Sequence, residues 1–186
     1  FYPVSYDNLS TGKKDFVKWG PLIIGDILDQ QKLEKVIKQH KVKAVIHLAA
    51  KSQVEESEKK FKNYFNNNVI GTACLLEAMR KSDVNKIIFS STASVYGNIS
   101  KGSIKENDSL SPINNYGLTK LYCENLINHF ALNDSLNFII LRYFNAAGSD
   151  YDSGIGELRD PETHLIPRIS EQILKKKNYF CLWQSI

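Results

Sequence analysis

Cysteine is scarce in this sequence, and long apolar runs are absent from it. Its 186 residues include three cysteines, Cys74, Cys123 and Cys181, and no two of them have the Cys-x-x-Cys spacing. An odd number of unpaired cysteines argues against a disulfide framework and against a zinc or other metal site, and it suits a reducing cytoplasm. No apolar run approaches the length that crosses a bilayer, so the sequence predicts neither a membrane partner nor a signal peptide.

A strong excess of charge of either sign is also lacking. The 24 basic and 20 acidic residues give a formal net charge of +4 and are spread along the chain. The one dense basic cluster, residues 175–177, is well placed to end a helix, where cations interact favourably with the helix dipole. We therefore expect no nucleic-acid partner. With 42% hydrophobic and 24% charged residues, the composition is that of an ordinary soluble protein with one domain and a sizeable core.

Strand-like and helix-like segments alternate along the chain. Apolar runs predict strands at 4–6, 21–24, 43–50, 85–91 and 138–143, and amphipathic spacing predicts helices over 29–40, 61–81, 116–133 and 165–177. The run at 43–50 is continuous rather than alternating, as in a strand that is buried on both faces of a parallel sheet. We therefore expect an α/β fold, a Rossmann-like doubly wound parallel sheet with right-handed crossovers.

Tyr116 and Lys120 stand four residues apart in a segment with helical spacing, so both side chains would lie on one helix face. A free tyrosine, with a pKa of about 10, is a poor base at neutral pH. A fixed positive charge nearby favours the phenolate and lets the phenol act in proton transfer, and Lys120 could supply this charge. A lone Tyr-x-x-x-Lys would more simply be a core aromatic residue and a surface lysine, so the context decides.

That context is an apolar run at 86–89 that breaks into Ser90, Ser91 and Thr92, at the expected carboxyl end of a strand. Ligands bind at this end of the strands in an open parallel sheet. Thr92, Tyr116 and Lys120 resemble the catalytic set of the extended short-chain dehydrogenase/reductase family, in which a Ser or Thr after such a strand acts with a Tyr and a Lys. The constellation, rather than either motif alone, favours a catalytic site.

Polar residues at two earlier strand ends indicate where a dinucleotide would bind. Asp7 and Asn8 follow the first expected strand, where the carboxylate of a dinucleotide-binding fold accepts hydrogen bonds from the adenosine ribose. A turn is the simpler interpretation of Asp-Asn taken alone. Asp26 could cap the helix that begins near Asp29 or contact the adenine amine, and the two roles are compatible. Within the run at 43–50, His47 is expected to be a satisfied core histidine, and the small residues that follow allow close approach by a ligand.

Further motifs extend the resemblance along nearly the whole chain and narrow it to the UDP-hexose 4-epimerases of that family. The most particular are Arg-Tyr-Phe-Asn-Ala-Ala-Gly at 142–148 and Pro-Glu-Thr-His-Leu-Ile-Pro at 161–167, and the others begin at residues 7, 25, 47, 67 and 90. The resemblance implies NAD-dependent epimerisation at C4 of a UDP-hexose, between UDP-glucose and UDP-galactose, through a 4-keto intermediate. It also implies a homodimer in the intact protein.

The resemblance further implies a role for each matching residue. Thr92, Tyr116 and Lys120 would be catalytic, the first two also contacting the sugar and Lys120 also reaching the nicotinamide ribose. An acidic Asp7 would favour NAD over NADP, whose 2′-phosphate it repels. The remaining residues implied to bind NAD are Asp7, Asn8, Asp26 and Ile27 on the adenosine side, Leu48, Ala49, Ala50 and Asn67 toward nicotinamide, and Phe144 beside its ring, while Asn145, His164 and Leu165 would face the UDP-hexose.

Three other functions stay open from the sequence. A nucleotide-sugar 4,6-dehydratase shares the Tyr and the Lys, but such enzymes resemble one another in placing an Asp-Glu pair directly after the active-site Thr, whereas Ala93 and Ser94 follow Thr92 here. A UDP-glucuronate decarboxylase is less easily excluded. The chain could also be an inactive NAD-binding fragment, and acceptance of N-acetylated sugars is left open.

The sequence also predicts that family segments are missing at both ends of the chain. We expect residues 1–186 to be a partial NAD-binding Rossmann domain, with the start of a substrate-binding region at about 149–186. The family's Gly-rich loop and first strand would precede Phe1, and its substrate-binding half would follow Ile186. Residues 180–184 suggest a change of reading frame, since the family has an aromatic residue followed by glycine there. The isolated chain is accordingly expected to fold without cooperativity and to bind NAD weakly.

Overall fold

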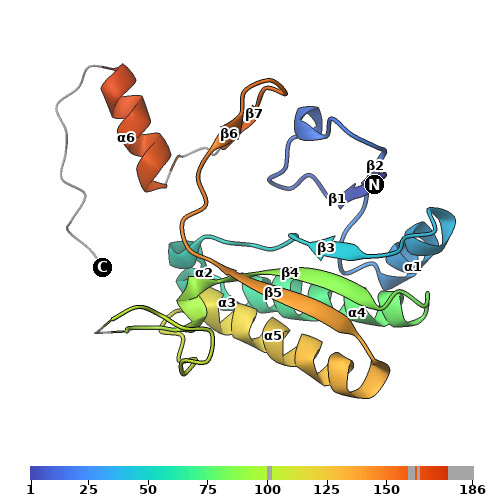
Figure 1. Ribbon diagram of the computed structural model, residues 1–186. Helices are drawn as coiled ribbons and strands as arrows, with labels where there is room; N and C mark the ends of the chain where they lie inside the picture. Colours follow the sequence, from blue (N-terminus) through green and yellow to red (C-terminus); the bar gives the residue numbers. More distant parts are fainter. Residues whose placement is uncertain (100–101, 159–161, 163, 176–186) are drawn as a thin grey trace. The chain divides into compact units, whose positions relative to one another are not determined.

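The computed structural model describes residues 1–99, 102–158, 162 and 164–175, in two units. The first unit runs from Phe1 to Phe144 and the second from Asn145 to Ile186, and each is described by itself. The elements of the first unit alternate as predicted, along the colour gradient of Figure 1. In chain order they are β1 (Ser5–Asp7), the 3-10 turn η1 (Lys14–Phe16), β2 (Leu22–Ile24), α1 (Gln30–Gln39), β3 (Val45–His47), α2 (Val54–Lys59), α3 (Phe61–Tyr64), the π-helical segment η2 (Phe65–Ile70), α4 (Gly71–Arg80), β4 (Lys86–Thr92), the 3-10 turn η3 (Ala93–Val95), α5 (Asn115–Asp134) and β5 (Asn137–Tyr143).

All paired strands of the first unit run parallel, which confirms the predicted α/β class. β4 is the central strand of the order β3-β4-β5, and its last residue, Thr92, lies opposite Tyr143 of β5. β1 pairs with β2 in one parallel sheet, and β3, β4 and β5 form a second parallel sheet.

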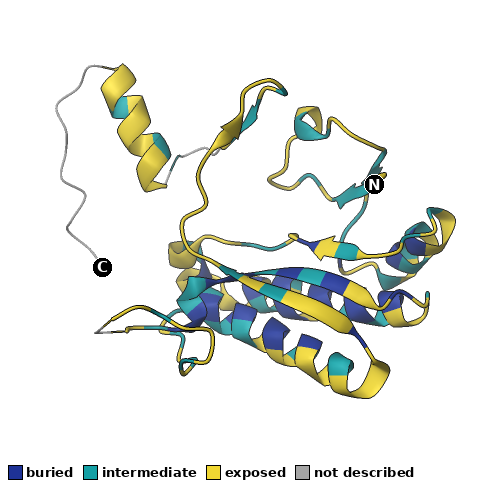
Figure 2. Cartoon of the chain, in the orientation of Figure 1, coloured by how far each residue is buried: buried dark blue, intermediate teal, exposed yellow. Residues whose placement is uncertain are grey.

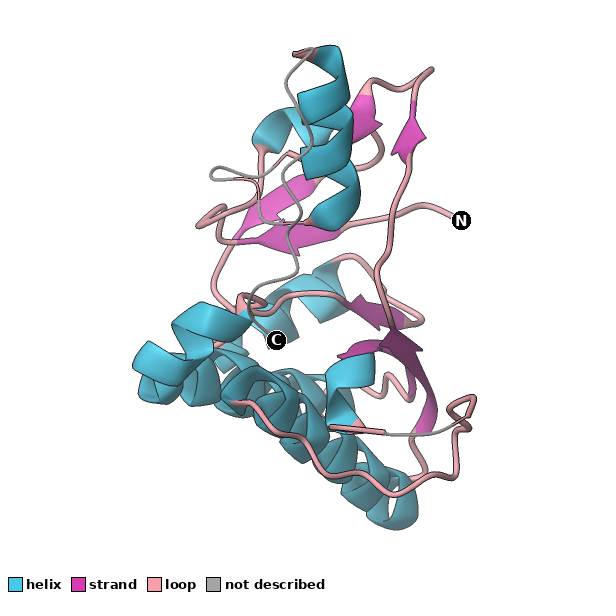
Figure 3. Ribbon diagram, turned by 90° about the vertical axis from the view of Figure 1, so that its left-hand side faces the viewer, coloured by secondary structure: helices cyan, strands magenta, loops and turns pink. Residues whose placement is uncertain are grey.

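The core lies between the three-stranded sheet and the helices on one of its faces, where Figure 2 shows the buried residues concentrated. Alternate residues of a strand point to opposite faces, so Ile87 and Phe89 of β4 face the helices. They are 2% and 1% exposed, and they belong to one cluster with Leu76 and Met79 of α4 and Ile127 of α5. Figure 3 shows these helices gathered along one side of the sheet. Burial of each such side chain contributes about 1.5–3 kcal/mol.

The helix predicted over 61–81 is present from Phe61 to Arg80 as α3, η2 and α4 in succession. Its middle is a π-helical segment that contains the three asparagines at 66–68. Such segments occur frequently at functional sites. One of the three asparagines, Asn68, is buried in the core.

The second unit contains a short antiparallel hairpin, β6 (Ser149–Asp150) paired with β7 (Ile155–Gly156), and the helix α6 (Leu165–Leu174). The sequence predicted no regular structure between 149 and 161, and it missed this two-residue pairing because each strand is too short to show a period. Residues 180–184, where a change of frame was expected, lie outside the described residues. Among the helices that the structure describes, none is long and apolar enough to cross a membrane.

Candidate active site

Tyr116 and Lys120 lie on one face of α5, one helical turn apart, as the sequence predicted. The helix begins directly before Tyr116, where the Asn114 side chain caps it by accepting a hydrogen bond from the Gly117 N–H at 2.7 Å. The Lys120 Nζ lies 6.0 Å from the centroid of the Tyr116 ring. The two functional groups therefore face the same space beside the end of β4.

Lys120 is buried, with 3% of its surface exposed, and its ammonium lies beneath the strand end. The Nζ donates a 2.8 Å hydrogen bond to the Ser90 carbonyl and lies 4.9 Å from the centroid of the Phe89 ring. Burial disfavours the charged form and lowers the pKa of Lys120 to about 8, against the opposing effect of the Cys123 thiol and the Glu124 carboxylate. At neutral pH most of the lysine is still protonated, so Tyr116 has a cation beside it.

Thr92 ends β4 and is brought to the start of α5 by a close approach between α5 and η3. The Thr92 Oγ1 accepts a 3.2 Å hydrogen bond from the Ser94 N–H, which caps η3 and fixes the hydroxyl. A Cβ added to Gly117 would lie 2.7 Å from the Ser94 carbonyl oxygen, a distance that real Cβ atoms essentially never show. Glycine at 117 is therefore needed for α5, which carries Tyr116, to pack against the turn after Thr92.

A buried ion pair lies one helical turn farther along α5. The Glu124 carboxylate accepts hydrogen bonds from Nη2 and Nε of Arg142 at 2.8 and 3.1 Å. It also accepts one from the Ser91 hydroxyl at 2.5 Å. Arg142 also donates to the Tyr96 hydroxyl and to the Glu106 carbonyl, both at 2.9 Å. The contact with Glu124 raises the pKa of Arg142. This pair links α5, β4, β5 and the loop after η3, and it was not predicted from the sequence.

Asn68, rather than the predicted Asn67, has the most extensive contacts of the π-helical segment. The Asn68 side chain is 2% exposed, accepts from the Lys51 N–H at 2.8 Å, and donates to the Lys51 carbonyl at 3.0 Å and to the Thr119 hydroxyl at 3.1 Å. Asn67 donates to the Asn68 side chain at 3.0 Å. Asn68 thus fixes the loop after β3 against α5, and Asn67 stays a predicted cofactor contact.

His47 is a core residue, as expected, and not a base. Its Nε2 lies 2.9 Å from the Thr72 hydroxyl, which itself donates to the Asn68 carbonyl at 2.6 Å. Burial, with a smaller effect of the nearby Lys120 charge, lowers the pKa of His47 to about 3. The imidazole is therefore neutral at physiological pH and adds no second cation beside Lys120.

On the predicted adenosine side, Asp7 ends β1, and Asp26 follows β2. The Asn8 side chain donates to the Asp26 carboxylate at 3.0 Å, and the Leu9 N–H donates to Asp7 at 2.6 Å. A Cβ added to Gly12 would lie 3.1 and 3.3 Å from the two Asp7 carboxylate oxygens, so glycine leaves space around this carboxylate. A carboxylate has about four acceptor positions, and the residues present therefore fit a ribose diol.

Asp26 does not cap the following helix, which was one of its two predicted roles. Its carboxylate accepts from the Leu28 N–H at 2.9 Å, and the cap of α1 is Asp29, whose side chain accepts from the Lys32 N–H at 3.0 Å. The error arose because both carboxylates precede the same helix. The adjacent Ile27 is 7% exposed and belongs to the core, so a cofactor contact by this residue would have to come from its backbone.

The other predicted cofactor residues lie at or near strand ends of the three-stranded sheet. Leu48, Ala49 and Ala50 follow β3, and Phe144 follows β5 directly. Leu48 and Phe144 are each 66% exposed within the chain. Large apolar side chains in such exposed positions leave surface that a cofactor could cover, and their roles stay predictions.

The predicted substrate residues Asn145, His164 and Leu165 belong to the second unit. His164 precedes α6, and its Nδ1 contacts the Glu157 carboxylate, while its backbone N–H donates to Glu162 at 2.8 Å. Leu165 is the first residue of α6. Contacts of these three residues with a substrate stay predictions. Pro161 and Thr163 of the same motif lie outside the described residues.

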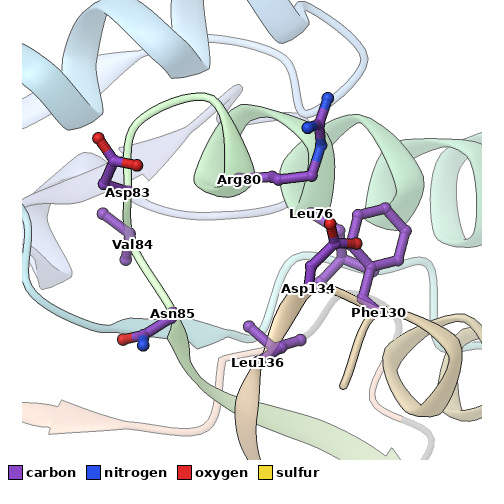
Figure 4. A pocket seen from close by; sticks show the side chains of 8 residues that line it. All are labelled: Leu76, Arg80, Asp83, Val84, Asn85, Phe130, Asp134 and Leu136. Carbon is purple, nitrogen blue, oxygen red and sulfur yellow. The ribbon is translucent and has the colours of Figure 1, made fainter. Parts of the chain in front are cut away.

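A hollow of about 330 Å³ lies at the opposite end of the sheet from Thr92 (Figure 4). It opens between the amino ends of β4 and β5 and the carboxyl ends of α4 and α5. Its lining is formed by Leu76, Arg80, Asp83, Val84, Asn85, Phe130, Asp134 and Leu136. Ligands of parallel α/β sheets bind at the carboxyl ends of the strands. The candidate site is therefore at Thr92 and not in this hollow.

Comparison with known proteins gives consistent matches over almost the whole chain. The model of the NAD dependent epimerase/dehydratase family matches residues 4–185. The UDP-glucose 4-epimerase of Rhizobium meliloti (strain 1021) is 44% identical over 180 residues, which cover 97% of this chain and 55% of that protein. The chain spans about half the length of the curated relatives it matches.

Solved structures also match most of this chain. The UDP-glucose 4-epimerase from Brucella ovis, in complex with NAD, is 46% identical with a TM-score of 0.88, over 90% of this chain and 52% of that one. The enzyme from Thermotoga maritima, with UDP-glucose, is 30% identical with a TM-score of 0.82, over 94% of this chain and 55% of that one. Both similarities extend beyond the sheet to most of the described chain.

Proposed function

The chain belongs to the NAD dependent epimerase/dehydratase family, and from this premise we propose that the protein carrying it epimerises C4 of a UDP-hexose. The reaction would interconvert UDP-glucose and UDP-galactose through a 4-keto intermediate. The observation that carries the proposal is the buried Lys120 ammonium beside Tyr116, at the strand end occupied by Thr92. The names of the similar proteins support an epimerase over a dehydratase or a decarboxylase.

In the proposed mechanism, Tyr116 takes the proton of the sugar C4 hydroxyl and later returns it. Lys120 supplies the positive charge that favours the phenolate form of Tyr116. Thr92, whose hydroxyl is held by the Ser94 N–H, would donate a hydrogen bond to the same sugar oxygen and keep it in line. NAD held by the residues named below would supply reversible hydride transfer at C4, so that no net redox occurs.

Several residues would hold this NAD. Asp7 would accept hydrogen bonds from the adenosine ribose, which the open space beside Gly12 supports, and its charge would select against NADP. Lys120 would reach the nicotinamide ribose. The other proposed cofactor contacts are Asn8, Asp26, Ile27, Leu48, Ala49, Ala50, Asn67 and Phe144, which lie at strand ends or, for Asn67, in the π-helical segment.

The UDP-hexose would contact Asn145, His164 and Leu165, as well as Thr92 and Tyr116. Epimerisation requires that the 4-keto sugar turn over before it takes the hydride back. The protein must therefore bind the UDP group firmly and the hexose loosely. This division of affinity is part of the proposal.

We also propose that the intact protein is a homodimer that works in the cytoplasm. Phe61, Phe65 and Tyr122 form a row of ring contacts, with centroid distances of 5.9 and 6.1 Å, and Phe61 and Tyr122 are 37% and 39% exposed. Such aromatic surface is typical of interfaces. Cys74 and Cys123 are free thiols, which suits a reducing compartment. Sedimentation of a monomer at micromolar concentration would refute the dimer.

The function is tested by incubating the protein with NAD and UDP-glucose and following the anomeric proton signals by NMR. Appearance of UDP-galactose up to a fixed equilibrium ratio, reached equally from UDP-galactose as the starting sugar, is the expected result. A 4-keto-6-deoxy product would indicate a dehydratase instead. Conversion of UDP-glucuronate with loss of CO₂, without any UDP-galactose from UDP-glucose, would indicate a decarboxylase.

A further inference from the structure

The N-terminus of α5 is held by a distant segment of the chain. The first N–H groups of any α-helix have no partner within the helix. In α5 the first internal bond is donated by the Leu118 N–H to the Asn114 carbonyl, so the N–H groups of Asn115, Tyr116 and Gly117 need other acceptors. The Asn114 side chain accepts the hydrogen bond of the Gly117 N–H. The acceptors of the other two N–H groups both come from α2, almost 60 residues earlier in the sequence.

Ser57 of α2 is the acceptor for Tyr116. The Tyr116 N–H donates to the Ser57 Oγ at 3.0 Å, and Ser57 is fully buried, with 0% of its surface exposed. The Ser57 hydroxyl proton is engaged elsewhere, because Oγ donates to the Val54 carbonyl at 2.5 Å. The hydroxyl is therefore oriented with a lone pair toward Tyr116. A buried N–H without its acceptor is costly.

Glu58, the next residue of α2, holds the residue before Tyr116. Its carboxylate accepts from the Asn115 N–H at 2.7 Å and from the Asn115 side-chain amide at 3.2 Å. The Asn115 side-chain amide also donates a hydrogen bond to the Ser57 carbonyl at 3.3 Å. A carboxylate at the N-terminus of a helix also interacts favourably with the helix dipole. Two consecutive residues of α2 thus fix the two residues at the start of α5.

α2, which follows the proposed nicotinamide path in the chain, is itself held by Tyr64 of α3. The Gln53 N–H donates to the Tyr64 hydroxyl at 3.1 Å, and that hydroxyl donates to the Glu56 carboxylate at 2.9 Å. Burial and the Glu56 carboxylate raise the pKa of Tyr64, which keeps the hydroxyl protonated and able to donate. The start and the middle of α2 are therefore anchored to α3.

We propose that Ser57 and Glu58 are positioning residues for Tyr116, which place its phenol relative to Thr92 by fixing the backbone from which it projects. This inference rests on the proposed role of Tyr116 in catalysis. Ser57 contacts the Tyr116 backbone and Glu58 contacts the Asn115 backbone, so each acts through the backbone at the start of α5. Because α2 follows the proposed nicotinamide path directly, it would also keep Tyr116 in register with the cofactor.

The test compares Ser57→Ala and Glu58→Ala with Glu55→Ala in the whole protein that carries this chain. Glu55 lies on the same helix but pairs only with the exposed Lys59 in the contacts described, which makes it a matched control. Ser57→Ala is expected to lower kcat about tenfold, because small displacements of catalytic groups are expensive, while KM for UDP-glucose and Kd for NAD change less than about twofold. Glu58→Ala is expected to lower kcat about threefold, since its contacts are exposed to solvent. Glu55→Ala is expected to match the wild type.

Amide hydrogen exchange gives a second measurement that needs no turnover. The Tyr116 amide is expected to exchange about tenfold faster in Ser57→Ala, with the amides in the middle of α5 unchanged. Unchanged kcat together with unchanged Tyr116 exchange in Ser57→Ala would overturn the inference, and so would equal falls of kcat in Glu58→Ala and Glu55→Ala. If the wild-type protein forms no UDP-galactose, the proposed function fails. Local loss of Tyr116 protection then still decides whether Ser57 holds this residue.

Discussion

The carboxylate of Glu124 and the guanidinium of Arg142 form a two-point ion pair, with Nη2–Oε2 and Nε–Oε1 distances of 2.8 and 3.1 Å. Glu124 is 2% exposed, and the pair joins α5 to β5 one helical turn after Lys120. This pair is less exposed to solvent than other ion pairs of the same unit, such as that of Arg80 with Glu77. The two kinds of pair are expected to respond very differently to substitution.

Glu124→Gln is expected to lower the free energy of unfolding by about 3 kcal/mol, because it removes the counter-charge of Arg142, whose side chain is 19% exposed. Glu77→Gln, which breaks the exposed pair with Arg80, is the control and is expected to cost less than about 1 kcal/mol. Urea denaturation of both variants in the whole protein measures the difference. Equal losses in the two variants would show that the buried pair is not a structural link.

Lys120→Met is expected to abolish turnover and to raise stability at pH 7, on the order of 2 kcal/mol. Burial lowers the pKa of Lys120 to about 8, below its unfolded value of about 10.4, so the unfolded chain binds more protons between these pH values. The stability cost of the buried charge is therefore complete below pH 8 and disappears as the pH rises toward 10.4. The stability difference between Lys120→Met and the wild type should shrink between pH 7 and pH 9.5. A difference that is constant across this range would show that Lys120 is not buried as a cation.

Gly117→Ala separates helix propensity from packing. Alanine within a helix is normally more stable than glycine by about 1 kcal/mol. Here the added Cβ would lie 2.7 Å from the Ser94 carbonyl oxygen, so α5 must move away from η3 and Tyr116 from Thr92. We expect kcat to fall by about 100-fold, the scale of a 1 Å misplacement. Wild-type kcat in a variant of raised melting temperature would contradict this close approach.

Thr92→Val keeps the shape of the side chain and removes its hydroxyl. Loss of one hydrogen bond to the sugar C4 oxygen is expected to lower kcat/KM by about 10–100-fold, less than the loss of Tyr116. The Ser94 N–H also loses its acceptor, so the melting temperature has to be measured beside the kinetics. A loss as large as that of Tyr116→Phe, with an unchanged melting temperature, would assign proton transfer to Thr92 instead.

The fold class, most helices and the placement of Tyr116, Lys120 and Thr92 could be predicted, because each depends on local periodicity or on the end of a strong apolar run. The cap of α1 was uncertain, because Asp26 and Asp29 both precede that helix and the choice between them depends on backbone geometry.

The supporting residues of the site were missed for a related reason. Ser57 and Glu58 act on residues almost 60 positions later in the chain, and nothing in α2 itself indicates that contact. Glu124 did carry a signal, because it lies four residues after Lys120 on an otherwise largely buried face of α5. Among the asparagines at 66–68, the π-helical turn decides which amide faces inward, and sequence spacing assumes ordinary helical geometry.

Proton transfer through Tyr116 is tested most directly by comparing Tyr116→Phe with the wild type in the whole protein, supplied with NAD and UDP-glucose. The variant lacks only the phenol oxygen, so fold and NAD affinity are expected to be unchanged. UDP-galactose formation, followed by NMR, is expected to fall by at least about 1,000-fold, consistent with the contribution of a positioned general base and acid. Epimerisation by Tyr116→Phe at the wild-type rate would contradict the mechanism.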